Sequence, residues 1–286
     1  MRLIVSSKQD KASQNILSQL LKKDWTEIEE FRDNPVYKKK TEEGTDHIVI
    51  VNKHHIYCDD LDKDVAELLD VEFDEVVFIS KHSSEAGVHS LTVHPIGNYG
   101  GAKYGGKEGK LVPCSPHNMT SALLGLKKKA KEEGIYDDYQ VSLEATHHGP
   151  YLETPAYYIE IGSDESSWKD ESAGEAIART VMSGSVRGEA GKGVGAVCIC
   201  IGGGHYAPRF TRLAFERKAA IGHIVPGWGM KYLTSRSFEE MVKKTPDIEY
   251  VYFDRSSTSG KERKRVKRWA EDHGVEVVRS DDMKKR

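Results

Sequence analysis

Cysteine is scarce in this chain: four of the 286 residues are cysteines, and no two of them form a Cys-x-x-Cys pair. We therefore expect reduced thiols rather than a disulfide framework. Long apolar runs are also missing. The longest, residues 194–201, has the length of one buried strand and falls far short of the roughly 20 residues that cross a bilayer. Because the N-terminal region also lacks a secretory signal, we expect a cytoplasmic protein without a transmembrane helix.

No charge of one sign dominates, since 42 Lys and Arg oppose 45 Asp and Glu for a formal charge of −3. The 38% hydrophobic content and 26 glycines are near globular averages, which excludes wholesale disorder. A chain of this length forms one large domain or two smaller ones. We expect a single domain over residues 1–286, and any division into two lobes near residues 98–116.

Apolar strand-like runs alternate with helix-like runs from one end of the chain to the other. Short apolar strands between helices predict a three-layer α/β domain, with a sheet covered on both faces. A hairpin is expected at residues 47–58, and the glycine-rich residues 98–109 are expected to form a functional loop. The remaining expected strands are 3–6, 76–80, 90–95, 140–146, 157–162, 194–201, 222–225, 249–254 and 275–279, and the expected helices are 14–23, 118–133, 169–182, 237–244 and 260–273.

Five of the 12 histidines stand where expected strands end: His82, His94, His147, His148 and His205. Ligands of α/β sheets bind outside the carboxyl ends of the strands, so loops that carry imidazoles can converge on one pocket there. A lone histidine is more often a hydrogen-bonded surface or core residue. The grouping at strand ends favours a shared site.

The segment 142–163 concentrates Glu144, His147 and His148 around the loop signal Gly149-Pro150. Imidazole and carboxylate are the ligands of hydrolytic zinc sites, which keep one position for the attacking water. Adjacent histidines on a regular strand point to opposite faces, so both can share a site only where the chain has turned. A general base that acts without a metal is the alternative.

Residues 202–209, GGGHYAPR, follow the strongest buried-strand candidate. Consecutive glycine amides can bind a phosphate, a carboxylate or a developing oxyanion. Arg209 could contact a phosphate and Tyr206 could offer a stacking face. The alternative is a tight turn that requires positive φ. The glycines concerned are Gly202, Gly203 and Gly204.

Lys81, His82 and Ser83 stand together after the strand at 76–80. We expect Ser83 to bond to substrate rather than to act as a nucleophile, because the GxSxG elbow is absent. Basic residues cluster at 255–268 and 127–131. Each cluster is either a solvated helix face or, if it borders the histidine cleft, a guide for a polyanion.

Four segments together resemble the archaeal and plant type of D-aminoacyl-tRNA deacylase: residues 80–98, 142–168, 202–209 and 222–225, including EATHHGP and GGGHYAPR. The resemblance implies a cytosolic, zinc-dependent monomer that hydrolyses the ester between a D-amino acid and the acceptor end of tRNA. It also implies a central mixed sheet similar to the phosphorylase and peptidyl-tRNA hydrolase folds. No membrane or DNA partner is expected.

The motif positions of that family fall on His82 with Ser83, His94, Glu144 with His147 and His148, Glu160, His205 and His223. Our hypothesis assigns the metal or base to His82, His147, His148 and His205, with Glu144 as base or orienting group. His94, Glu160 and His223 are alternative ligands. Lys81, Ser83, Tyr206, Arg209 and the amides of residues 202–204 are assigned to substrate.

Two other functions remain open. One is a peptidyl-tRNA or other tRNA-ester hydrolase that uses histidine without a metal. The other is a non-catalytic RNA-binding protein, in which the basic helix matters and the histidines are structural. RNA binding alone gives no reason for five histidines at strand ends.

Overall fold

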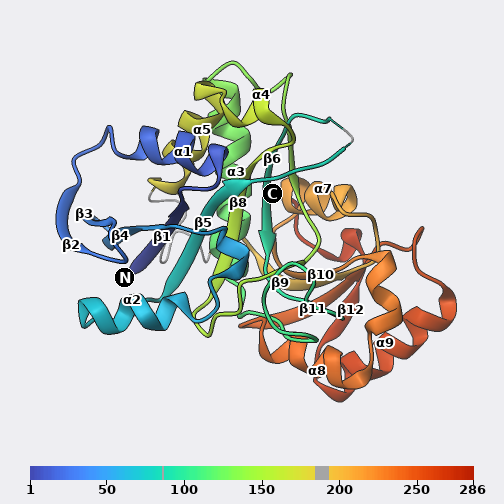
Figure 1. Cartoon of the computed structure of the whole chain (residues 1–286). Helices are drawn as coiled ribbons and strands as arrows, with labels where there is room; N and C mark the ends of the chain where they lie inside the picture. The colour runs from blue at the N-terminus through green and yellow to red at the C-terminus, as the bar shows by residue number, and fades with distance from the viewer. Residues whose placement is uncertain (86, 184–192) are drawn as a thin grey trace.

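The computed structural model describes residues 1–85, 87–183 and 193–286 and contains two sheets (Figure 1). The larger is mixed and has eight strands in the order β2-β3-β4-β1-β5-β8-β6-β7. β1 is parallel to β4 and β5, and β5 is parallel to β8, whereas β6 is antiparallel to β8. Its strands are β1 Arg2–Ser7, β2 Thr26–Glu30, β3 Pro35–Thr41, β4 Gly44–Val51, β5 Glu75–Lys81, β6 Ser90–Pro95, β7 Gln140–Leu143 and β8 Ala156–Gly162.

The smaller sheet is wholly parallel and has the order β10-β9-β11-β12. Its strands are β9 Ala196–Ile201, β10 Ala219–Val225, β11 Ile248–Phe253 and β12 Glu276–Val278. Phe210 of α7 (Pro208–Glu216) packs on one face, against Tyr252. Residues of α8 (Ser235–Lys243) and α9 (Gly260–Asp272) cover the other face.

Side chains of the larger sheet alternate between two different surroundings. Val77, Val93 and Ile159 point toward the core formed with α1 (Lys11–Leu20), α3 (Pro116–Glu132) and α5 (Glu171–Val181). Phe78 and Tyr158 point the other way, into the core that contains residues of α2 (Leu61–Leu69). The expected three-layer α/β arrangement with a mixed sheet is confirmed.

Helix α3 joins the two sheets. Thr120 Oγ1 accepts a hydrogen bond of 2.8 Å from the Ile221 amide of β10. The core on this side is shared, because Leu126 of α3 belongs to the same cluster as Val77 of β5 and Cys198 of β9. The short elements are α4 (Glu165–Trp168) and the 3₁₀ turns η1 (His55–Tyr57), η3 (Gly227–Tyr232) and η4 (Ser280–Asp282).

Three expectations about the fold were wrong or incomplete. The expected strand at 54–58 is absent, and this segment contains the turn η1 (His55–Tyr57), so β4 has no hairpin partner there and pairs instead with β1 and β3. β2 and β3 were missed because they are rich in charged residues; β2 is exposed at the edge of the sheet, and β3 beside it is mostly half-buried. Strands β9–β12 form a second sheet of their own.

All four cysteines are buried and unpaired, as expected. No helix in the described ranges is long and apolar enough to cross a bilayer. The single domain over 1–286 stays a prediction.

His47 of β4 gives a test of this packing. The side chain is 1% exposed, its ring meets Phe73 edge-on, and its Nδ1 has no hydrogen-bond partner. Burial, assisted by the charge of Lys38, lowers the His47 pKa to about 4. The unfolded chain therefore binds a proton that the folded chain does not, and stability falls as the pH falls from 6.5 toward 4.

The variant His47→Leu removes this proton linkage. Its stability relative to the native chain should be greater at pH 5 than at pH 8 by roughly 2 kcal/mol. Urea unfolding at the two pH values measures the difference. An equal effect at both would contradict the assignment.

Candidate active site

The candidate site lies on one face of the larger sheet, where the neighbouring strands β5, β8 and β6 place polar side chains in adjacent rows. Glu160 of β8 pairs in register with Thr92 of β6 and Ser80 of β5, and His94 pairs with Tyr158. Residues paired in this way point to the same face. Helices α1, α3 and α5 cover the opposite face. The polar face opens toward a pocket.

The loop after β7 places further polar side chains over these rows. The Glu144 amide continues the sheet by donating to Val93 O at 3.0 Å, and the Ala145 amide donates to His205 O at 2.8 Å. His205 follows β9, so the second sheet contributes to the site through this bond. His148 has a φ of +42°, which turns the chain and lets it share a site with its neighbour His147.

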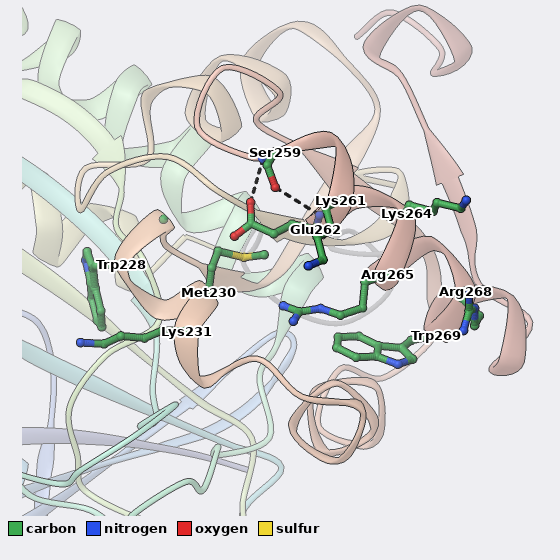
Figure 2. Close-up of a pocket in the computed structure, with 11 residues that line it drawn as sticks. Trp228, Met230, Lys231, Ser259, Lys261, Glu262, Lys264, Arg265, Arg268 and Trp269 are labelled. Atoms are coloured by element: carbon green, nitrogen blue, oxygen red, sulfur yellow. Dashed lines mark hydrogen bonds between the residues drawn. The ribbon is translucent and has the colours of Figure 1, made fainter.

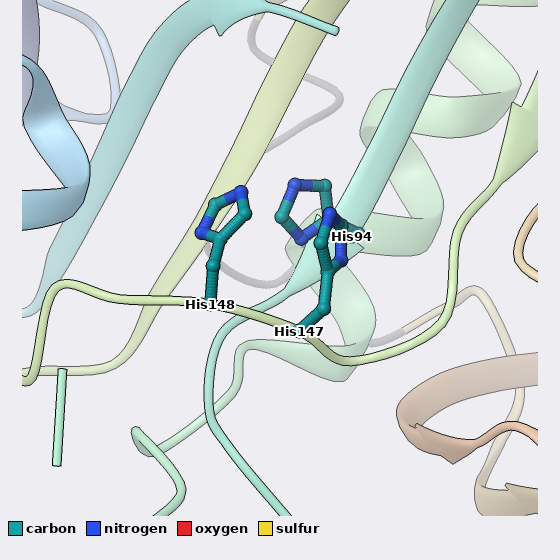
Figure 3. Close-up of side chains that lie close together, drawn as sticks. All are labelled: His94, His147 and His148. Atoms are coloured by element: carbon teal, nitrogen blue, oxygen red, sulfur yellow. The ribbon is translucent and has the colours of Figure 1, made fainter. Parts of the chain in front are cut away.

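The rings of His94, His147 and His148 face one another (Figure 3). Their centroids are 4.2 to 5.0 Å apart, and one nitrogen from each lies within 4.8 Å of the other two. In each, Nδ1 lies 2.7 to 3.0 Å from a backbone carbonyl. Because a carbonyl only accepts, Nδ1 must carry a proton, and in the neutral ring Nε2 then keeps its lone pair. This is the arrangement of metal-binding histidines.

Glu144 is fully buried and faces three imidazoles. Its Oε1 is 3.2 Å from His82 Nδ1, and its Oε2 is 3.0 Å from His205 Nε2 and 3.7 Å from His147 Nε2. Neither oxygen has a hydrogen bond of good alignment. Burial alone would raise the Glu144 pKa, but the imidazoles, led by His205, outweigh burial and lower it. The group therefore stays ionised, and its unsatisfied oxygens fit a site that holds a cation.

Burial, with the charge of His94, lowers the pKa of His147 well below its usual range and that of His148 to about 3. Both rings are therefore neutral near pH 7, as metal ligands must be. Burial, together with the Glu144 charge, raises the pKa of Glu160, which lies 3.6 Å from His94 Nε2. The histidine pocket thus combines the ionised carboxylate of Glu144 with the neutral imidazoles of His147 and His148.

The histidine pocket encloses about 370 Å³. Lys81 and Ser83 line it as expected, and the Lys81 ammonium lies 4.8 Å from the centre of the Trp168 ring. Tyr206 joins the site through its hydroxyl, 3.0 Å from His82 Nε2. This Tyr206 contact is a hydrogen bond rather than the stacking face that we expected.

Other expected site residues are engaged elsewhere. The Gly202 amide donates to Val225 O at 2.7 Å and the Gly203 amide to Ser257 Oγ at 2.6 Å, so neither can bind an oxyanion. Both have positive φ, which bears out the tight-turn alternative. The assignment of the Gly204 amide to substrate stays a prediction. Arg209 pairs with Asp254 at 3.2 Å and lines a different hollow.

His223 is fully buried, with Nδ1 3.2 Å from Thr146 Oγ1 and Nε2 3.0 Å from Val112 O. Since both ring nitrogens are engaged, His223 is excluded as a metal ligand. The four histidines expected to bind one metal also separate, because His82 and His205 group with Glu144 while His147 and His148 group with His94.

The pocket wall contains residues that the sequence analysis missed. Tyr104 and His54 line it, and Tyr104 lies within the glycine-rich segment that we expected to be functional. Gly105 follows with a φ of +76°, and a Cβ there would lie 1.6 Å from Ile56 O. The glycine therefore allows this loop to approach η1 closely, which holds Tyr104 beside the histidines.

The low pKa of His148 can be measured by NMR. In chelator-treated protein, the ring nitrogen shifts of His148 should keep the neutral pattern from pH 7 to pH 4, because burial opposes protonation. The variant His148→Gln identifies the signal. A titration midpoint near 6.5 would contradict the neutral assignment.

Comparison with known proteins relates this chain to one family. A family model described as D-aminoacyl-tRNA deacylase matches residues 69–278. D-aminoacyl-tRNA deacylases of Pyrococcus horikoshii and Pyrococcus furiosus are 37% and 36% identical, over 98% of this chain and 100% of theirs. A relative from Methanococcoides burtonii is 36% identical over 99% of this chain, which spans 57% of that protein.

Solved structures agree with this placement. The crystal structure of a conserved protein of unknown function superposes with a TM-score of 0.85 at 31% identity, covering 99% of this chain and 96% of its own. Nucleosidase structures are distant, with TM-scores of 0.40–0.41 over 63% of the chain. From the family match and the full-length relatives, the chain belongs to the D-aminoacyl-tRNA deacylase family.

Proposed function

We propose that this protein hydrolyses the ester bond of D-aminoacyl-tRNA and so releases the D-amino acid and free tRNA. The observation that carries the proposal is the buried, ionised Glu144 ringed by imidazoles at the wall of an open pocket. An aminoacyl ester is already activated, so its hydrolysis requires an oriented water, a proton acceptor and a positive group near the oxyanion. The pocket contains candidates for each role.

His94, His147 and His148 are the residues that we assign to a Zn²⁺ ion. Three imidazoles whose Nδ1 atoms are anchored by backbone carbonyls match the ligand set of a catalytic zinc site, and a bound cation would displace the proton that the carboxylates hold on His94. The ion would supply a Lewis acid that lowers the pKa of water to near 7. Compared with our expectation from the sequence, His94 replaces His82 and His205 in the ligand set.

His205 and Glu144 are assigned to proton transfer. Glu144 Oε2 lies 3.0 Å from His205 Nε2, close enough to orient the imidazole, and the His205 side chain is 35% exposed toward the pocket. The Nδ1 atom of His205 then accepts a proton from the attacking water, as in a carboxylate–imidazole pair. The water oxygen bonds to the ester carbon, the ester C–O bond breaks, and the proton passes to the leaving ribose oxygen. Lys81 stabilises the oxyanion.

Discrimination against L-aminoacyl esters is steric in this proposal, because the two substrates carry identical functional groups. The protein acts as a monomer in the cytoplasm, where it recycles mischarged tRNA. The chemistry requires no second subunit, since the described part of one chain supplies every residue assigned above.

Metal dependence is tested with matched D-tyrosyl-tRNA and L-tyrosyl-tRNA. The D ester alone should be hydrolysed, activity should disappear after chelation, and added Zn²⁺ should restore it. D-selective hydrolysis that is unaffected by chelation would contradict the metal assignment and support a histidine base that acts alone. Hydrolysis of neither ester would overturn the proposed function.

Substitutions at the pair should reduce turnover without loss of tRNA binding. We expect His205→Ala and Glu144→Gln each to lower kcat by roughly 10²–10⁴-fold, the range of general acid–base catalysis. The matched control is His89→Gln, since His89 lies outside the pocket and faces Asp164. Single-turnover hydrolysis and filter binding measure the two effects. A native rate in His205→Ala would contradict its role.

A further inference from the structure

A second hollow lies between η3 and α9 and encloses about 910 Å³ (Figure 2). We call it the basic groove, after the five cationic side chains that line it. All five are exposed to solvent. They are Lys231, Lys261, Lys264, Arg265 and Arg268.

The positive charge of the basic groove is not neutralised by neighbouring acids. Within the described ranges, none of its five cations lies within 4.0 Å of a carboxylate. The one acid in the lining, Glu262, accepts a hydrogen bond of 2.7 Å from the Ser259 amide and so caps α9. An uncompensated cluster of this kind favours an anionic partner.

Other basic stretches differ in this respect. Arg209, Arg212 and Arg217 each pair with an aspartate or glutamate at 2.8 to 3.2 Å. In the 127–131 run, Lys129 pairs with Glu132, and Lys127 lies over the Phe215 ring. Of the two basic clusters in the sequence, only the one on α9 lines a groove that leads toward the histidines.

Aromatic rings accompany the cations. Trp228 is 55% exposed at one side of the groove, beside Lys231, and Trp269 lies at the other with the Arg265 guanidinium 5.1 Å from its centre (Figure 2). A cationic groove with exposed rings is the surface that proteins use to bind single-stranded nucleic acid, because bases stack on rings while phosphates meet cations.

A third hollow adjoins both the basic groove and the histidine pocket. A smaller hollow of about 270 Å³ shares Trp228 and Lys231 with the groove. It shares Tyr104, His147 and His148 with the histidine pocket. A chain-like ligand can therefore extend from the reacting ester past Tyr104 and Trp228 to the cations of α9.

We propose that the unpaired 3′ strand of the tRNA substrate follows this route, with its phosphates held in the basic groove and at least one base stacked on Trp228. The inference rests on the proposed function and adds the path of the polynucleotide. A single strand fits because its bases are free to reach the rings, whereas those of a duplex are stacked on one another.

The test compares two esters of the same D-amino acid: D-tyrosyl-tRNA and 2′(3′)-O-D-tyrosyladenosine, which lacks the phosphates. In the double variant Arg265→Glu with Arg268→Glu, KM for the tRNA ester should rise at least tenfold. Hydrolysis of the adenosine ester should stay within twofold of the native rate. The slope of log KM against log salt should weaken by about 0.7 for each phosphate that the variant groove no longer binds.

The control carries the same charge change on α3, as Lys128→Glu with Lys131→Glu, and should behave like the native chain. An equal loss in this control would overturn the groove assignment, because it would reflect total charge. A native KM for the tRNA ester in the α9 variant would also overturn it. Failure of the native protein to cleave either ester would instead refute the proposed function.

Trp228→Ala provides a second variant that changes no charge. Loss of a stacked base should raise KM for D-tyrosyl-tRNA roughly tenfold, leave the salt slope unchanged, and leave the adenosine ester unaffected. Unchanged KM for the tRNA ester would remove Trp228 from the route.

Discussion

The negative charge of Glu144, held away from solvent, is the constraint on which the rest of the site depends. An ionised carboxylate in such a place costs several kcal/mol unless opposite charge or hydrogen bonds compensate it. The compensation comes from His205, His82 and His94, and in our proposal also from a cation beside them. Each histidine therefore supports the charge as well as the chemistry, and removal of the carboxylate would leave the imidazoles without orientation.

Much of the fold could be predicted because apolar runs and helix periodicity are local signals. The strands at residues 90–95 and 157–162 were predicted in this way, as was the grouping of histidines. We also expected them to meet at the carboxyl ends of parallel strands, which was wrong for His94. His94 lies within β6, which is antiparallel to β8, and it points from the same face of the sheet as Glu160. Strand direction depends on distant pairing, so residue spacing does not reveal it.

The engaged residues show a second limit of sequence reasoning. The amides of Gly202 and Gly203, and both nitrogens of His223, are consumed by hydrogen bonds to residues far along the chain. The composition does not reveal the basic groove, because the formal charge of −3 is a sum over the whole chain. A polyanion responds to the local excess of positive charge on α9, where acidic residues are few.

The bond from the Ala145 amide to His205 O links the loop of one sheet to the loop of the other. His205 thus reaches Glu144 only when the two sheets are docked. A chain that has folded its first sheet alone holds His94 of β6 and the two histidines of the loop after β7 but lacks the imidazole assigned to proton transfer. In the proposed mechanism such a chain would not hydrolyse aminoacyl esters, so activity depends on the arrangement of both sheets and not on the histidine-bearing sheet alone.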